Sequence, residues 1–167
     1  MRIQLAALLA VAPLFAVAAP DVKASLRDAK GKAIGTATLT QTDGGVRVVV
    51  KVQGVTPGPH AFHVHEFGKC EGPDFESAGS HFNPDHREHG TANPKGSHLG
   101  DLPNVTVDAT GTGTGDFVLQ GATLAAGPKS VAQKALVLHA APDDLKSDPA
   151  GNAGDRIACG VIGPQLK

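Results

Sequence analysis

Residues 61–66 read Ala-Phe-His-Val-His-Glu, and this stretch decides the fold class. Successive side chains of a β-strand point to opposite faces, so Phe62 and Val64 share one face while His63 and His65 share the other. The alternation predicts a strand that buries its apolar face and projects two imidazoles together, away from the core. Two imidazoles on one face can bind a single ion, although this signal alone is weak.

Histidine is concentrated around this strand. Seven of the eight histidines of the 167-residue chain lie between residues 59 and 101. We interpret the clustering as a sign of metal chemistry, because imidazole is a common metal ligand. The seven are His60, His63, His65, His81, His86, His89 and His98.

Period-two alternation also predicts strands on both sides of residues 61–66. Val46, Val48, Val50 and Val52 form the apolar face of one of them, and Asp43-Gly44 before it is a strong hairpin signal. The predicted strands cover residues 22–28, 33–42, 46–53, 61–66, 102–108, 115–119, 135–139 and 156–162.

These eight strands indicate an all-β protein, with an antiparallel meander formed by the first three. The chain contains no credible helix of ten residues. Long polar loops at 67–99 and 140–155 are expected to be functional, because loops of this length are uncommon in compact domains. The pattern fits an eight-stranded Greek-key sandwich or flattened barrel.

The N-terminus is typical of a secretory signal peptide. Arg2 precedes an apolar run over residues 3–17, and Ala16-Val17-Ala18 resembles a cleavage site. A membrane anchor is the alternative, but the run is shorter than the roughly 20 residues of a span and Pro13 interrupts it. We therefore expect residues 1–18 to be removed, leaving residues 19–167 as one domain without a membrane anchor.

The charge of the expected mature chain is close to balanced. Without Arg2 it has 14 basic and 16 acidic residues, a formal charge of −2, which favours neither nucleic acid nor an anionic membrane as a partner. The chain has no Trp and no Tyr, residues common at stable interfaces. A monomer or weak homodimer is therefore expected.

The two cysteines predict one disulfide. In an exported chain, Cys70 and Cys159 are expected to pair rather than remain free thiols. The bridge closes a long loop, which the chain-entropy model values at roughly 4–5 kcal/mol. It pins a segment beside the histidines to the last strand.

Further candidate ligands complete two sites. His139 lies on the strand whose Leu136 and Leu138 face the core, so it points outward like His63, and His81 can add a fourth imidazole. Four imidazoles suit copper or zinc, with a tetragonal arrangement favouring copper. His89, His98 and Asp101 with one more imidazole suit tetrahedral zinc. Seven side chains are one too few for two four-coordinate sites, so one histidine must serve both ions.

At this point the sequence resembles a known family. The resemblance is carried by His-Val-His-Glu-Phe-Gly (63–68), Gly-Ser-His-Phe-Asn-Pro (79–84), His-Leu-Gly-Asp-Leu-Pro-Asn (98–104) and Gly-Asn-Ala-Gly-Asp-Arg-Ile-Ala-Cys-Gly (151–160), with His139 and Asp-Asp-Leu (143–145). These motifs look like those of copper/zinc superoxide dismutases in their exported bacterial form. They span nearly the whole expected mature chain in the same order.

The resemblance implies one copper and one zinc ion per chain, a bridging histidine and two supporting residues. Asp143 would hold His63 and His89 in their tautomers, and Arg156 would bind the substrate anion beside copper. The implied copper ligands are His63, His65, His81 and His139, and the implied zinc ligands are His81, His89, His98 and Asp101.

The implied activity is dismutation of superoxide to oxygen and hydrogen peroxide in the periplasm. By resemblance, His81 would leave reduced copper, take up a proton and deliver it to the departing peroxide. The alternatives are a non-catalytic copper/zinc buffer or carrier on the same scaffold, and a sandwich used only for binding.

Several residues have other interpretations or depart from the family pattern. His60 is interpreted as a structural or surface residue and His86 as a solvated loop residue. The pair Asp143 and Asp144 could form an acid/base site, but the resemblance makes Asp143 a partner of metal-binding histidines. Ala150 replaces a threonine found in many relatives. Three lysines are weak candidates for guiding the substrate: Lys69, Lys95 and Lys146.

Overall fold

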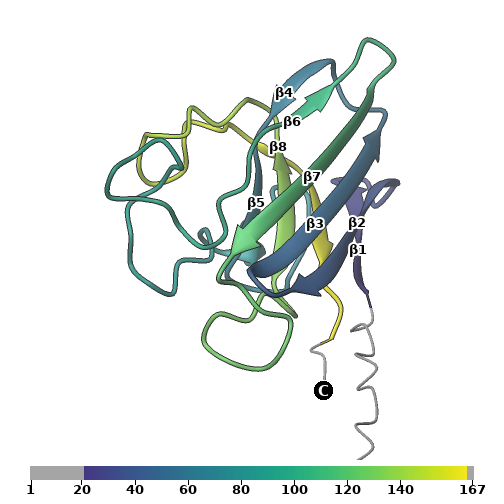
Figure 1. The fold of residues 1–167 in the computed structure, drawn as a ribbon. Helices are drawn as coiled ribbons and strands as arrows, with labels where there is room; N and C mark the ends of the chain where they lie inside the picture. Colours follow the sequence, from purple (N-terminus) through teal and green to yellow (C-terminus); the bar gives the residue numbers. More distant parts are fainter. Residues whose placement is uncertain (1–20, 165–167) are drawn as a thin grey trace, which may run out of the picture.

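The computed structural model describes residues 21–164 and shows an all-β protein (Figure 1). Within this part of the chain the single helical segment is the short 3₁₀ turn η1 (Glu76–Ala78), and no helix is long and apolar enough to cross a membrane. The strands are β1 (Val22–Asp28), β2 (Ala33–Thr42), β3 (Gly45–Gln53), β4 (Gly58–His60), β5 (Phe62–His65), β6 (Val105–Val107), β7 (Thr112–Gln120), β8 (Ala135–His139) and β9 (Arg156–Val161).

The first three strands form the predicted antiparallel meander. Every second residue of β3 is buried, because Val46, Val48, Val50 and Val52 pack into the core while the residues between them face outward. The alternation of the sequence therefore sets both the strand and its orientation. The signal peptide predicted at residues 1–18 lies outside the described residues.

The sheet is almost closed on itself. Its strand order is β4-β6-β7-β3-β2-β1-β9-β8-β5, so β4 and β5 lie at opposite edges although Ala61 alone separates them along the chain. The two edges must therefore meet. The chain connection through Ala61 brings them together into a flattened barrel. The N–H of Ala61 donates to Ala141 O at 2.9 Å and the N–H of His139 donates to Ala61 O at 2.9 Å, which continues the pairing of β5 with β8, and His60 Nδ1 on β4 lies 2.7 Å from His139 O.

The predicted count of eight strands was wrong by one among the described residues. No strand was predicted between residues 53 and 61, but Gly58–His60 forms β4 and pairs with β6. Pro59 is tolerated because β4 is an edge strand of the hydrogen-bond ladder, where a missing N–H costs little. The all-β, antiparallel fold class is confirmed.

Two predicted strands also begin three residues away from the start that the structure gives them. Residues 102–104 were expected in a strand, but β6 begins at Val105, because Leu102, Pro103 and Asn104 belong to the loop that covers the histidines. Conversely, β7 is longer than predicted and begins at Thr112, since it pairs with β3 along the whole length of that strand.

The two long loops lie outside the barrel. The long loop between β5 and β6 and the loop between β8 and β9 lie side by side on one flank of the barrel (Figure 1), and the Ala92 N–H donates to Leu145 O at 2.9 Å between them. The predicted disulfide Cys70–Cys159 ties the first loop to β9, with a Cα–Cα distance of 5.5 Å. These loops bury the outward face of β5 and β8.

Candidate metal centre

Strand β5 supplies the first two histidines, and the loop after it is aligned by backbone hydrogen bonds. The N–H of Phe82 donates to Val64 O at 2.8 Å and the N–H of Val64 donates to Gly100 O at 2.9 Å. These bonds place His81 opposite His65 and Asp101 opposite His63, as isolated antiparallel bridges. Loop residues that are far apart in the sequence are thereby held in register with the strand.

The first cluster consists of four buried histidines whose candidate ligand atoms lie within 4.8 Å of one another. One ring nitrogen of each is buried and has no hydrogen-bond partner. Burying an unpaired polar atom is costly, so four such atoms facing one another fit a bound cation. The atoms are His63 Nδ1, His65 Nε2, His81 Nε2 and His139 Nε2.

The second cluster surrounds the Asp101 carboxylate, which is 8% exposed. Its Oδ1 lies 3.0 Å from His81 Nδ1, 3.1 Å from His89 Nδ1 and 3.3 Å from His98 Nδ1. His81 thus presents Nε2 to the first cluster and Nδ1 to the second. The two clusters share this one imidazole.

The pKa values of three histidines of the first cluster, His65, His81 and His139, are lowered. Burial first, then the charge of His81, lowers the pKa of His65 to about 2. Burial and neighbouring His63 lower the pKa of His139 to about 3, and burial lowers that of His81 to about 4 against the attraction of Asp101. At neutral pH each of these rings is neutral, so one nitrogen carries an N–H and the other offers a lone pair, which is the form that binds metal.

The second cluster has the opposite polarity. Burial lowers the pKa of His89, but hydrogen bonds to Asp101 and Asp143 outweigh burial and raise it to about 9. Burial raises the pKa of Asp101, yet hydrogen bonds from the three surrounding histidines hold it far below its usual value. In the metal-free chain this raised pKa keeps the His89 ring protonated at neutral pH, so His89 is a positively charged member of this cluster.

Asp143 lies between the clusters. Its Oδ2 is 2.8 Å from His63 Nε2 and its Oδ1 is 3.0 Å from His89 Nε2. Asn104 fixes the backbone of Asp143 with two hydrogen bonds, from Asn104 Nδ2 to Asp143 O at 3.0 Å and from the Asp143 N–H to Asn104 Oδ1 at 2.8 Å. Gly151 has a φ of +64°, and a Cβ there would collide with the Asp143 carboxylate. The close approach requires glycine.

Arg156 lies next to the first cluster. Its Nη1 donates to Phe75 O at 2.8 Å and its Nη2 donates to Gly79 O at 2.8 Å. The same Gly79 oxygen is 2.9 Å from His65 Nδ1. After burial and the neighbouring histidines, the charge of Arg156 also lowers the pKa of His65 and of His139.

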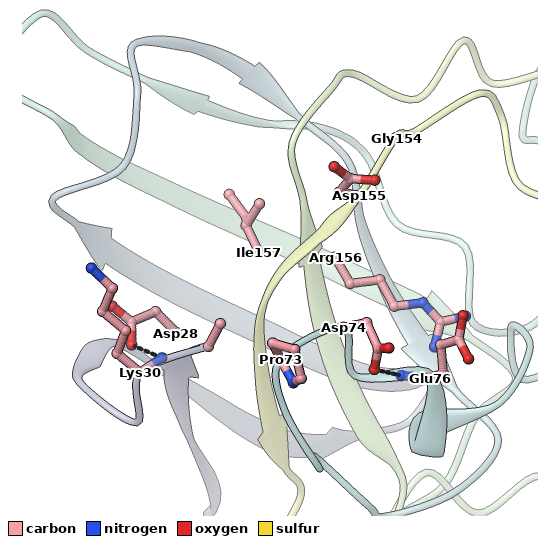
Figure 2. A pocket seen from close by; sticks show the side chains of 10 residues that line it. Asp28, Lys30, Pro73, Asp74, Glu76, Gly154, Asp155, Arg156 and Ile157 are labelled. Carbon is pink, nitrogen blue, oxygen red and sulfur yellow. Dashed lines mark hydrogen bonds between the residues drawn. The ribbon is translucent and has the colours of Figure 1, made fainter.

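Two hollows adjoin this region. A cleft of about 790 Å³ is lined by Arg156, Asp74 and Glu76. Figure 2 shows Arg156 extending from β9 towards the segment that carries Asp74 and Glu76. A second hollow of about 410 Å³ borders His139 and is walled by the loop between β8 and β9, including Asp148 and Ala150. Neither hollow is lined by the lysines considered for substrate guidance, which are Lys69, Lys95 and Lys146.

Two described histidines, His60 and His86, belong to neither cluster. His60 is 2% exposed, and its Nδ1 lies 2.7 Å from His139 O and its Nε2 2.8 Å from Thr56 O, which is a structural role at the closure of the barrel. His86 is exposed on the loop after β5. Both positions agree with the interpretation from sequence.

The structure brings together every residue predicted for the two sites. Sequence reasoning missed the supporting partners Asn104, Gly151 and Asp148. It also missed the carbonyl acceptors, because a backbone carbonyl carries no sequence signal. The acidic partner of His89, Asp143, was accessible only through the family resemblance.

A flattened antiparallel barrel carrying two adjoining, histidine-rich clusters defines a class of binuclear metalloproteins. The comparisons place the chain within this class. Residues 33–162 match the family model described as copper/zinc superoxide dismutase (SODC). The chain belongs to the copper/zinc superoxide dismutase family, a family of oxidoreductases, as the sequence predicted.

Individual relatives agree with this assignment. The chain is 47% identical over 144 residues to "Superoxide dismutase [Cu-Zn] 1" of Aquifex aeolicus, covering 83% of this chain and 85% of that protein. The Cu/Zn superoxide dismutase of Brucella abortus is 30% identical, with a TM-score of 0.70 over 86% of this chain and 99% of that chain. A double mutant of a SOD-like protein from Bacillus subtilis is 37% identical, with a TM-score of 0.81 over 84% and 96%.

Proposed function

We propose that the chain dismutes superoxide to molecular oxygen and hydrogen peroxide, with one copper and one zinc ion bound at the two clusters. The observation that carries the proposal is the shared imidazole of His81, whose two nitrogens face different clusters. Neither cluster reaches four ligands without it. Because the two nitrogens of His81 face different clusters, both nitrogens have a metal to bind only when both ions are present.

The donor sets distinguish the two ions. Four imidazoles without a carboxylate suit copper, so His63, His65, His81 and His139 would hold it. Three imidazoles with one carboxylate suit tetrahedral zinc, so His81, His89, His98 and Asp101 would hold zinc. When bound, copper supplies the one-electron redox chemistry of dismutation.

The protein's own groups bind the anion and move the proton. Arg156 presents a guanidinium whose orientation is fixed by two carbonyls, which favours binding of a small anion beside the first cluster. His81 Nε2 is the atom that takes up a proton and donates it to the peroxide product. Asp143 keeps the Nδ1 atoms of His63 and His89 directed into the clusters.

We also infer where the protein functions and how it assembles. The disulfide between Cys70 and Cys159 agrees with an exported protein of the bacterial type. We infer export by residues 1–18 and function in the periplasm, with residues 19–167 as the mature domain. We further infer a monomer or weak homodimer.

The deciding experiment measures copper and zinc stoichiometry together with dismutation by the purified chain and by the Arg156→Ala variant. One ion of each metal and a rate that falls in the variant support the proposal. A non-catalytic buffer or carrier predicts both metals without dismutation, and a sandwich used only for binding predicts no stoichiometric metal. Either result would overturn the proposed activity.

A further inference from the structure

His98 differs from the other cluster histidines in how its outer ring nitrogen is held. Of the six, His81 uses both nitrogens in the clusters, and four others have hydrogen-bond partners in the Asp143 carboxylate or in carbonyls of Gly79 and Gly154. His98 directs Nδ1 to the second cluster, 3.3 Å from Asp101 Oδ1. Its Nε2 has no partner within hydrogen-bond distance among the described residues.

A second carboxylate approaches that nitrogen. Asp148 Oδ1 lies 3.9 Å from His98 Nε2, and no other carboxylate lies within 4.0 Å of this nitrogen among the residues that the structure describes. His98 is 7% exposed, whereas the Asp148 side chain is 53% exposed. An exposed carboxylate therefore lies close to an almost fully buried ligand.

The same oxygen holds the neighbouring ligand. The backbone N–H of His89 donates to Asp148 Oδ1 at 2.6 Å. Asp148 belongs to the loop between β8 and β9, while His89 and His98 belong to the loop between β5 and β6. One carboxylate therefore connects two ligands of the second cluster to the opposite loop.

We propose that Asp148 is a positioning residue for the zinc ion of the second cluster. A carboxylate near the outer N–H of a ligating imidazole favours that tautomer and makes the ring a stronger metal ligand. Asp148 places such a charge 3.9 Å from His98 Nε2, without a hydrogen bond, and holds the backbone of His89 by a hydrogen bond. Asp148 also lines the hollow beside His139. The inference rests on the proposed function, which takes zinc as the occupant.

The test compares zinc affinity of the full chain with that of Asp148→Asn. Asparagine keeps an oxygen for the His89 N–H but removes the charge opposite His98. Competition with a chelator should show zinc affinity about tenfold lower, at the weak end of the 10- to 100-fold effect of outer partners. Asp148→Glu should recover most of the loss. The visible spectrum of cobalt(II) bound in place of zinc should change in Asp148→Asn, which a merely structural role in the loop would not produce.

Asp144→Asn is the matched control, because it removes one charge from the same loop. Asp144 accepts N–H groups of Lys146 and Ser147 and contacts neither cluster. Its zinc affinity should stay within about twofold of the unchanged chain. Equal zinc affinity and cobalt spectra in Asp148→Asn and the unchanged chain would overturn this inference alone. Failure of the unchanged chain to bind stoichiometric zinc would overturn the ligand assignment and this inference with it.

Discussion

His139 and Arg156 are direct cross-strand partners between β8 and β9. The pairing skips Ile157, so the strands shift register between Leu138 and His139. Ile157 and Ala158 both pack towards the core, and Arg156 is left on the outward face with His139. A bulge that re-aims a side chain is a common device beside active sites. Here it brings the guanidinium next to a cluster histidine.

Replacing Arg156 should lower the dismutation rate without removing the metals. A unit charge about 4 Å from an anion contributes roughly 1–4 kcal/mol, and about 1.4 kcal/mol is a factor of ten in rate. We therefore expect Arg156→Ala to be slower by about tenfold or more per bound copper, and Arg156→Lys less so. Arg47→Ala is the control, because Arg47 pairs with Asp116 on the exposed surface of β3 and β7. An unchanged rate in copper-loaded Arg156→Ala would contradict the role.

Replacing Asp143 should weaken both metal sites together. The Asp143→Ala variant removes the acceptor for His63 Nε2 and His89 Nε2 at once. Loss of such a partner typically costs 10- to 100-fold in metal affinity. Chelator competition for copper and for zinc should show both affinities reduced. A loss confined to one metal would show that Asp143 does not connect the sites.

His60 should matter for stability rather than for metal binding. In His60→Ala, the carbonyl of His139 loses its partner in a buried hydrogen bond, and the carbonyl of the exposed Thr56 loses a part-buried one. Leaving buried polar groups unpaired costs about 1–3 kcal/mol each. We expect a lower free energy of unfolding in urea for the metal-free chain, whereas His86→Asn on the exposed loop should leave it unchanged. Equal effects of the two variants would refute a structural role.

The metal-free chain should lose stability in acid below about pH 6.5. The unfolded chain protonates histidine near its ordinary pKa of about 6.5, whereas His65, His81 and His139 accept protons in the folded state only at about 2, 4 and 3. The unfolded state therefore binds more protons in this window, so its population rises as the pH falls. His89, with a raised pKa of about 9, contributes stability below pH 6.5 that is lost towards pH 9. Urea unfolding between pH 4 and 7 checks the direction, and a rise in stability at pH 5 would be inconsistent with neutral buried rings.

Removing the disulfide should affect both stability and catalysis. Cys70 lies on the loop whose Phe75 and Gly79 carbonyls orient Arg156. A Cys70→Ser, Cys159→Ser variant should lose about 4–5 kcal/mol of unfolding free energy according to the chain-entropy model. Its rate per copper should also fall, because the acceptors of Arg156 are no longer anchored to β9. Full activity in the folded variant would show that the loop holds Arg156 without the bridge.

Local patterning settled much of the fold and part of the site. Alternation places Val48 and Val50 inside the barrel, and the same rule directs His63 and His65 to the opposite face from Phe62 and Val64. This information is local, since side-chain direction in a strand depends only on position parity. Recognised motifs added the distant members of both clusters.

The reaction geometry was decided by tertiary structure. Counting by parity from Cys159, which faces outward, puts residue 157 on the outward face and Arg156 on the inward face. The bulge reverses that order. The pairing of β8 with β9 therefore decides where the cation stands, because register depends on two strands and cannot be inferred from one.

The sequence by itself determined an all-β chain with two outward imidazoles on one strand, further ligands in its loops and a disulfide beside them. Only the tertiary structure decided that β4 and β5 close the barrel, that Nε2 of His81 faces the first cluster and Nδ1 the second, and that Asp148 reaches His89 and His98 from the opposite loop. The physical reason is that propensity and alternation act over a few residues, whereas these contacts join segments that meet only when the sheet has closed.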